Sequence, residues 1–154
     1  MKVIAIDPGT YALGIVIIES KTFEIIDSFK IKNNLGIICL EFDKYYSKEK
    51  GYVVVEKLQP QGKRVGMETF ETIYFSGRIE ERVELKYPMW KCERLGRKAV
   101  LGHLDKLYGA MSNDAKIRQI LISRFGKEHT KKLIADCWQA FALGVVFIDK
   151  LSEK

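Results

Sequence analysis

Three acidic residues at the edges of apolar sequence have the side chains needed to hold a divalent cation. Asp7 and Glu56 end the segments MKVIAID and GYVVVE, and Asp136 lies within LIADCWQAFALGVVFI. Carboxylate oxygens without a neighbouring His or Cys cluster favour Mg²⁺ or Mn²⁺ over zinc. Two such ions about 4 Å apart could activate a water molecule and stabilise the leaving oxygen of a phosphodiester. We therefore expect one site for metal-dependent phosphodiester hydrolysis, assembled from distant segments.

Each of these acids also has a structural explanation that the sequence leaves open. An Asp before Pro-Gly, such as Asp7, often serves only to form a turn, and a strand-ending Glu such as Glu56 can be solvated. Asp136 is expected within a helix with apolar residues on nearly every side, so its charge requires a cation or a partner such as Lys132. Gln139, one turn further along, could hydrogen-bond a phosphate or a metal-bound water, or be a solvated amide.

The segments that carry these residues alternate between strand and helix patterns. The patterns predict strands over Met1–Asp7, Leu13–Glu19, Glu24–Ile31 and Tyr52–Glu56, and helices over Leu35–Lys48, Val65–Arg82, Asp114–Phe125 and Thr130–Leu151. Val83–Trp90 is a weaker strand candidate because of Pro88, and Lys91–Gly109 is compatible with a helix, a loop or both. Since no linker or repeat interrupts the pattern, we expect residues 1–154 to form one α/β domain.

Basic residues outnumber acidic ones by 26 to 20, giving a net charge of +6. This excess is compatible with nucleic-acid binding or with an ordinary solvated surface. The placement of the basic residues favours nucleic acid, because they flank two of the three acids in the sequence. The candidate DNA-binding residues are Lys63, Arg64, Lys91, Arg94, Arg97, Lys98 and Lys132. Phe70, Tyr74 and Phe75 could stack on bases, but their helical spacing favours packing in the core.

The three cysteines, Cys39, Cys92 and Cys137, are odd in number and widely spaced in largely apolar surroundings. We expect them to be reduced core thiols in a cytoplasmic protein. With only two histidines and no paired cysteines, a zinc site is not expected. No apolar run approaches the roughly 20 residues that span a bilayer, and the N-terminal segment begins with a strand pattern rather than a secretory signal.

The ordered segments DPGT-x₃-G, VVVEK and ADCWQAFALG resemble the RuvC-like Holliday junction resolvases of the RNase H-like superfamily. The P-Q-G loop after Glu56 and the segment KLYGAMSNDAKIRQILISRFG resemble the bacteriophage and prophage branch in particular. The resemblance implies an α/β fold with a mixed five-stranded sheet flanked by helices. It also implies that Asp7, Glu56 and Asp136 are the metal-binding catalytic acids. The resemblance further implies a homodimer that would place two sites on opposite strands of a four-way junction, with hydrolytic cleavage that would leave 5′-phosphate and 3′-hydroxyl ends.

The last helix departs from the family pattern at one position. RuvC-like enzymes often carry an acid or His and a second Asp three residues apart on that helix. Here Asp136 is followed by Gln139, or preceded by Leu133 in the alternative register, so one of four usual ligands is missing. We include Gln139 among the candidate catalytic residues.

The leading interpretation is a structure-selective DNA endonuclease that cleaves Holliday junctions and other branched DNA, such as flaps and forks. Its location would be the cytoplasm of a bacterial host if the gene is phage-encoded. An RNA-processing nuclease of the related RuvX-like group stays open, because net charge does not distinguish DNA from RNA. A non-catalytic junction-binding protein stays open because of the missing ligand. An ATP-handling protein of the actin and sugar-kinase superfamily shares the D-x-G-T turn but needs two such domains.

Overall fold

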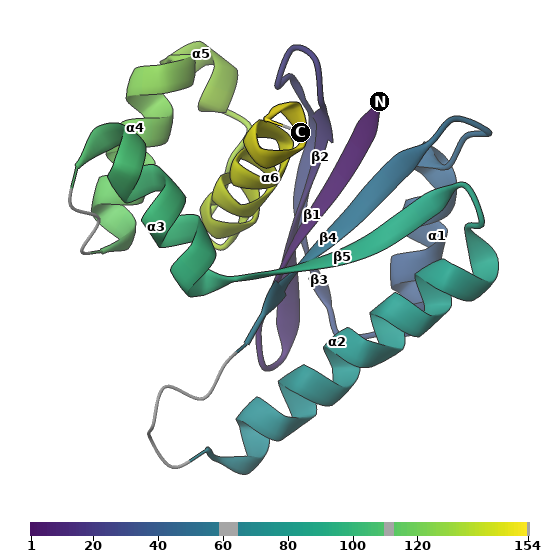
Figure 1. The fold of residues 1–154 in the computed structure, drawn as a ribbon. Coiled ribbons are helices and arrows are strands. Elements are labelled where there is room, and N and C mark those ends of the chain that lie inside the picture. Colours follow the sequence, from purple (N-terminus) through teal and green to yellow (C-terminus); the bar gives the residue numbers. More distant parts are fainter. Residues whose placement is uncertain (59–64, 110–112, 154) are drawn as a thin grey trace.

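A mixed five-stranded sheet forms the centre of the computed structural model, which describes residues 1–58, 65–109 and 113–153 (Figure 1). The strands are β1 (Lys2–Pro8), β2 (Ala12–Glu19), β3 (Ile25–Lys32), β4 (Gly51–Lys57) and β5 (Trp90–Gly96). Their order in the sheet is β3-β2-β1-β4-β5. β1, β2 and β3 are antiparallel neighbours, whereas β1, β4 and β5 are parallel.

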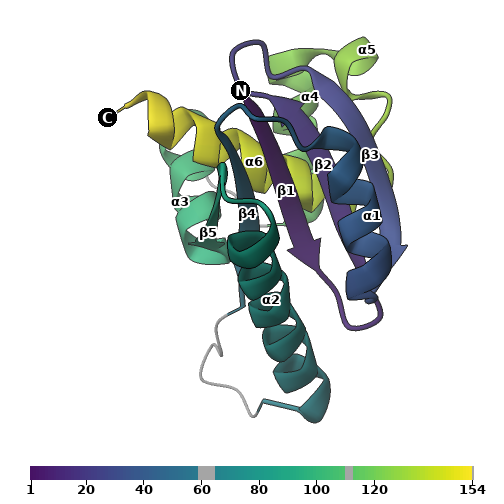
Figure 2. The same ribbon diagram turned by 90° about the vertical axis from the view of Figure 1, so that its right-hand side faces the viewer.

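Helices cover both faces of the sheet (Figure 2). One face packs against α1 (Leu35–Tyr45) and α2 (Met67–Lys86). The opposite face is covered by α3 (Arg97–Tyr108), α4 (Asp114–Phe125), α5 (Lys127–Thr130) and α6 (Cys137–Ser152). Among the helices of the described residues, none is both long and apolar enough to cross a membrane.

β1 is buried on both faces because it lies at the centre of the sheet. Ile4 and Ile6 pack in the cluster that contains α1 and α2, and the alternate residues Val3 and Ala5 pack in the cluster that contains α6. Successive side chains of a strand point to opposite faces. Asp7 therefore projects toward the α6 side of the sheet.

The expected α/β class and five-stranded mixed sheet are confirmed, but the fifth strand is not where the sequence predicts it. Val83 belongs to α2, where it is buried one turn after Ile79. The predicted strand Val83–Trp90 is wrong because Pro88 lies in the turn after the helix, and proline has no amide hydrogen to donate to a sheet. The strand begins at Trp90 instead, so the ambiguous segment Lys91–Gly109 consists of β5 followed by α3.

The last helix begins at Cys137 rather than at the predicted Thr130. Ala135 has a positive φ of 24°, which interrupts any continuous helix. Asp136 consequently precedes α6, and its side chain is 45% exposed rather than buried among apolar neighbours. Apolar periodicity does not reveal this break, because Leu133 is buried in the core even though it lies outside a helix.

The aromatic residues of α2 also differ from the prediction of core packing. Phe70 and Tyr74 are 58% and 69% exposed, and of the three rings Phe75 alone packs against the core. The buried row of the helix starts later, at Thr72, and continues through Ile79. The N-terminal half of α2 extends past the sheet (Figure 1), so the two exposed rings have no core beside them.

All three cysteines lie in the described residues and are free. Cys137 is buried, and Cys39 and Cys92 are partly buried. Burial raises the pKa of the Cys92 thiol to about 12 and also raises that of Cys137. Both groups are therefore protonated thiols at neutral pH, with little nucleophilic character.

Candidate active site

The parallel pairing of β1 and β4 brings Asp7 and Glu56 together at the carboxyl ends of the two strands. Ile6 is in register with Val55, so the two acids are the next residues on adjacent strands and project from the same face. Glu56 is only 7% exposed, and Asp7 is half-buried. The structure thus places two carboxyl groups side by side at the edge of the core.

The electrostatics of this pair favour a bound cation. The pKa of Asp7 is raised to about 8, first by burial and then by the hydrogen bond and negative charge of Glu56. Asp136 raises this pKa further, and Arg97 opposes the rise. Two neighbouring carboxylates that ionise only at a cost become a favourable site once a divalent cation neutralises them.

Asp136, the third acid, lies over a row of paired residues on three adjacent strands. Gly14 of β2 pairs with Asp7 on one side and with Lys30 of β3 on the other. A Cβ atom at Gly14 would lie 2.8 Å from the carbonyl carbon and oxygen of Asp136. Because Gly14 has no side chain, the residue before α6 can approach the sheet between Asp7 and Lys30.

Lys30 binds the Asp136 carboxylate in an exposed ion pair. Its Nζ lies 2.5 Å from Asp136 Oδ2, and the two side chains are 49% and 45% exposed. The alternative partner from the sequence, Lys132, instead donates from Nζ to the carbonyl oxygens of Ile25 and Ile26 at 2.9 and 3.4 Å. The difference arises because the helix begins after Asp136, so Lys132 does not share a helical face with it.

Arg97 provides a positive charge beside the acids. Its Nη1 donates to Gln139 Oε1 at 2.6 Å and lies 4.0 Å from Glu56 Oε1. Its Nη2 donates to Asp114 Oδ1 at 2.5 Å. Arg97 is the first residue of α3 and follows β5, the strand next to β4. Gln139 therefore reaches the site through the Arg97 guanidinium.

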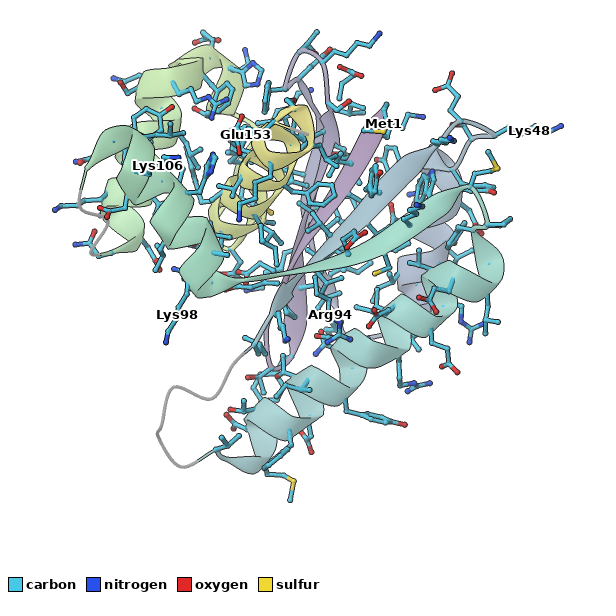
Figure 3. The ribbon with its side chains drawn as sticks, viewed as in Figure 1. Met1, Lys48, Arg94, Lys98, Lys106 and Glu153 are labelled. Carbon is cyan, nitrogen blue, oxygen red and sulfur yellow. The ribbon has the colours of Figure 1, made fainter. Side chains whose placement is uncertain are left out.

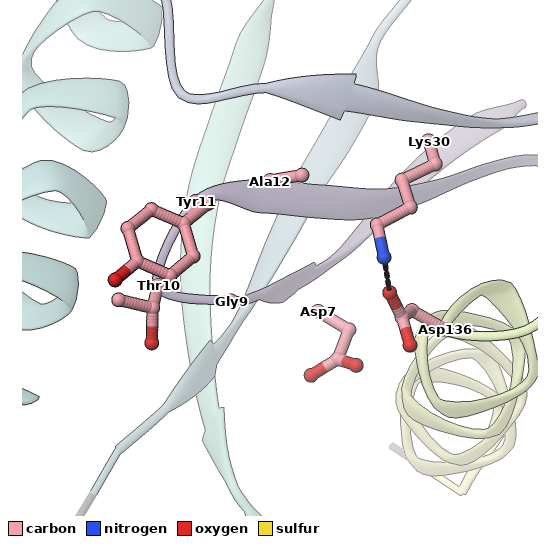
Figure 4. A pocket seen from close by; sticks show the side chains of 7 residues that line it. All are labelled: Asp7, Gly9, Thr10, Tyr11, Ala12, Lys30 and Asp136. Atoms are coloured by element: carbon pink, nitrogen blue, oxygen red, sulfur yellow. Dashed lines mark ion pairs between the residues drawn. The ribbon is translucent and has the colours of Figure 1, made fainter.

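The Asp7 and Asp136 side chains line an open pocket of about 400 Å³ (Figure 4). The hairpin between β1 and β2 contributes much of the rim, including Tyr11, which is 78% exposed. The lining residues are Asp7, Gly9, Thr10, Tyr11, Ala12, Lys30 and Asp136. A pocket of this size leaves room for a phosphate group and its sugar beside the carboxylates.

The three acids fit a hard divalent cation by their chemistry, although their side chains do not converge on one point. In the ranges that the structure describes, no three His, Cys, Asp or Glu side chains are arranged to hold a metal ion. Asp136 is turned toward Lys30, whereas Asp7 and Glu56 contact each other. Asp7 and Glu56 would bind a cation first, and Asp136 would complete the site by turning away from Lys30.

The basic residues predicted to bind DNA lie in different parts of the molecule. Arg97 is within the site, and Lys98 is exposed beside it in the first turn of α3 (Figure 3). Lys91 lies at the opposite end of β5, paired with Tyr52 at the start of β4. Four residue steps along the strand, roughly 13 Å, separate Tyr52 from Glu56.

The remaining candidates make structural contacts or lie outside the described residues. Arg94 binds Glu80 of α2, with Nε 2.7 Å from Oε2, and so connects α2 to β5. Lys132 holds the β3 backbone, as described above. Lys63 and Arg64, together with the P-Q-G loop, lie outside the described residues.

Lys30 and Asp114 are site residues that the sequence interpretation did not include. Lys30 is remote in sequence from the acids, and only the pairing of β3 with β2 brings it to Asp136. Asp114 begins α4 and reaches the site through Arg97. No specific signal marks Lys30 in the sequence, because Lys32, two residues further along the same face of β3, is also an exposed lysine.

No family model and no curated protein matches the sequence, but solved structures match the fold. Thermus thermophilus RuvC, in complex with a Holliday junction substrate, matches with a TM-score of 0.71 and 15% identity over 98% of this chain and 96% of that chain. Fowlpox virus resolvase, in complex with substrate Holliday junction DNA, matches with a TM-score of 0.61 and 16% identity over 98% of this chain and 99% of that chain. The yeast mitochondrial Holliday junction resolvase Ydc2 matches with a TM-score of 0.61 and 9% identity over 98% of this chain and 82% of that chain. The chain therefore has the RNase H-like fold found in RuvC and other Holliday junction resolvases.

Proposed function

We propose that this chain is a structure-selective DNA endonuclease that cleaves Holliday junctions and other branched DNA by phosphodiester hydrolysis, with residues 1–154 as one nuclease domain. The observation that carries the proposal is the meeting of Asp7, Glu56 and Asp136 at one end of the sheet. The fold supports it, because T. thermophilus RuvC and the fowlpox virus resolvase, which are similar to this chain, were solved with Holliday junctions.

Asp7 and Glu56 would hold a divalent cation, Mg²⁺ or Mn²⁺, with Asp136 as a further ligand. Such a cation supplies charge neutralisation and Lewis-acid stabilisation during attack on a phosphodiester. Arg97, 4.0 Å from Glu56, can stabilise negative charge that develops on the phosphate. Gln139 orients that guanidinium by accepting its hydrogen bond. These roles use both strand-end acids, Asp7 and Glu56, together with Asp136 at the start of α6.

We also propose that the protein acts as a homodimer. Its support is an exposed apolar row on α2, where Met67, Phe70 and Tyr74 are 73%, 58% and 69% exposed. Exposed apolar patches of this kind mark interaction surfaces. A dimer would offer two sites to two strands of a four-way junction. Light scattering tests the assembly, and a mass of one chain, 17.7 kDa, would contradict it.

Cleavage of a labelled four-way DNA junction tests the proposal. The junction is incubated with Mg²⁺ or Mn²⁺ beside matched duplex, flap and structured RNA substrates, with Asp7→Asn as the inactive control. Paired nicks in the junction that are absent in the variant would establish a resolvase that uses this carboxylate site. Cleavage confined to RNA would favour the RNA-processing alternative, and junction binding without cleavage would favour the non-catalytic one.

Gly14→Ala is expected to displace Asp136 and so reduce both stability and cleavage. The added methyl group would collide with backbone atoms of Asp136, and such overpacking costs about 1–3 kcal/mol. We expect a lower unfolding midpoint and junction cleavage slowed roughly 100-fold, since small misplacements in a site are costly. Gly102→Ala in α3, which meets no atom within 4 Å, is the control. Equal behaviour of the two variants would show that Gly14 does not position Asp136.

Lys98→Gln is expected to weaken junction binding and reduce its salt dependence. Lys98 is exposed next to Arg97, where a phosphate of bound DNA would pass. Loss of one phosphate contact lowers the slope of log K against log salt by about 0.9. Fluorescence anisotropy at several salt concentrations measures this slope. Lys48→Gln serves as the control, because Lys48 is exposed far from Lys98 (Figure 3), and an unchanged slope for Lys98→Gln would exclude a phosphate contact.

A further inference from the structure

We infer that Lys30 is a positioning residue, whose ammonium group holds Asp136 until a divalent cation takes that carboxylate and then binds a phosphate oxygen of the DNA. This exchange of partners rests on the proposed function. It would couple cation binding to DNA binding, because occupation of Asp136 by the cation frees a positive charge for the substrate.

The geometry gives Asp136 two competing partners. The Asp136 backbone lies over Gly14, and Gly14 pairs with Asp7 on one side and Lys30 on the other. Adjacent strands are about 4.8 Å apart, so Asp7 and Lys30, on the two strands that flank Gly14, are both close to the Asp136 carboxylate. In Figure 4 the Asp136 carboxyl group meets the Lys30 ammonium, and Asp7 projects into the same space.

The Lys30–Asp136 ion pair is of a kind that a divalent cation can replace. Both side chains are about half-exposed, and exposed ion pairs contribute little to stability. A divalent cation has twice the charge of an ammonium group and would also be bound by Asp7 and Glu56. The pair therefore positions the Asp136 carboxylate in the cation-free protein without fixing it there.

The released ammonium group would remain beside the substrate. Lys30 lines the same open pocket as Asp7 and the β1–β2 hairpin. Its flexible side chain can move within this pocket without a change in the sheet. By contrast, Lys132 is bound to two carbonyl oxygens of β3. Of these two lysines, Lys30 is the one whose partner a bound cation would remove.

Titration of Mn²⁺ into the DNA-free protein by calorimetry gives the first test. Lys30→Met removes the competitor, so we expect Mn²⁺ to bind roughly five-fold more tightly than to the wild type. Lys32→Met is the matched control, because Lys32 is an exposed lysine two residues further along the same face of the same strand. A change of less than two-fold is expected there. Equal affinities for the wild type and Lys30→Met would overturn the exchange.

Acetylation of lysines, followed by peptide mass spectrometry, gives a direct second test. A lysine in an ion pair is less reactive, so saturating Mg²⁺ should raise the acetylation rate of Lys30 several-fold, and added junction DNA should lower it again. Lys44, whose Nζ lies 2.7 Å from Glu41 Oε2 on α1, is the internal reference and should not change. If the acetylation rate of Lys30 did not respond to Mg²⁺, the release of the Lys30 ammonium group would be refuted.

The two measurements separate the exchange at Asp136 from the proposed nuclease function. Mn²⁺ binding by the wild type with no effect of Lys30→Met would refute the role of Lys30 and leave the metal site intact. No Mn²⁺ binding by the wild type would overturn both. Circular dichroism of each variant excludes unfolding as the cause of an altered affinity.

Discussion

Asp7→Asn is expected to lower junction cleavage by about 10²–10³-fold or more while junction affinity changes less than about three-fold. The substitution keeps the shape of the side chain but removes one of the two adjacent charges that would hold the cation. Binding is spared, because Asp7 is half-buried at the end of β1 and adds no positive charge for a phosphate to meet.

Single-turnover cleavage and anisotropy binding to the same labelled junction measure the two effects separately. Asp105→Asn makes the same chemical change at an exposed position on α3 and serves as the control. Comparable cleavage by Asp7→Asn and the wild type would refute the carboxylate site. Loss of binding and cleavage together would instead mean that Asp7 supports the DNA-binding surface.

In metal-free buffer the wild type is expected to lose stability between about pH 5.5 and 8, and Asp7→Asn is expected to abolish much of this loss. The pKa of Asp7 is raised from 3.8 to about 8 in the folded protein. Between these values Asp7 is protonated when folded and ionised when unfolded, so rising pH favours the unfolded chain. The contribution of Asp7 is fully present below about pH 4 and is lost as the pH passes 8.

Urea unfolding of both proteins with EDTA at pH 5.5, 7 and 8.5 measures the effect. From pH 5.5 to 8.5 we expect the free energy of unfolding to fall by about 1–3 kcal/mol more in the wild type than in Asp7→Asn. Carboxyl groups with lowered pKa values, such as Glu19 and Asp149, affect stability mainly below about pH 5 and are present in both proteins. Parallel pH profiles for the two proteins would contradict a strained Asp7–Glu56 pair. Mn²⁺ at pH 8.5 should stabilise the wild type more than the variant.

The positions of Asp7 and Glu56 illustrate what local sequence can predict. Each acid follows an apolar run that is long enough for one buried strand, and burial on both faces makes such runs continuous rather than alternating. Adjacent parallel strands end at the same edge of a sheet. The strand assignment and the place of each acid at a strand end therefore follow from patterns within about seven residues of each, whereas their proximity depends on the parallel pairing of β1 with β4.

Asp136 shows where local pattern is insufficient. Its apolar surroundings predicted a buried helical position, but the positive φ of Ala135 ends that continuity and leaves the carboxylate half-exposed. A backbone conformation of this kind depends on how α6 docks onto the sheet at Gly14. The sequence near residue 136 contains no Gly or Pro that would signal the break.

The sequence by itself determined the α/β class and the strands of the sheet centre, because strand and helix periodicity are local properties, and it singled out the three acids proposed as the site. Only the tertiary structure decided that Lys30 and Arg97 flank those acids. Lys30 reaches Asp136 through the register of β2 and β3, which shifts between Ile17 and Ile18. A slip of one residue would turn Lys30 to the other face of the sheet. Register and helix docking are set by contacts between distant segments, and for this reason no local pattern specifies them.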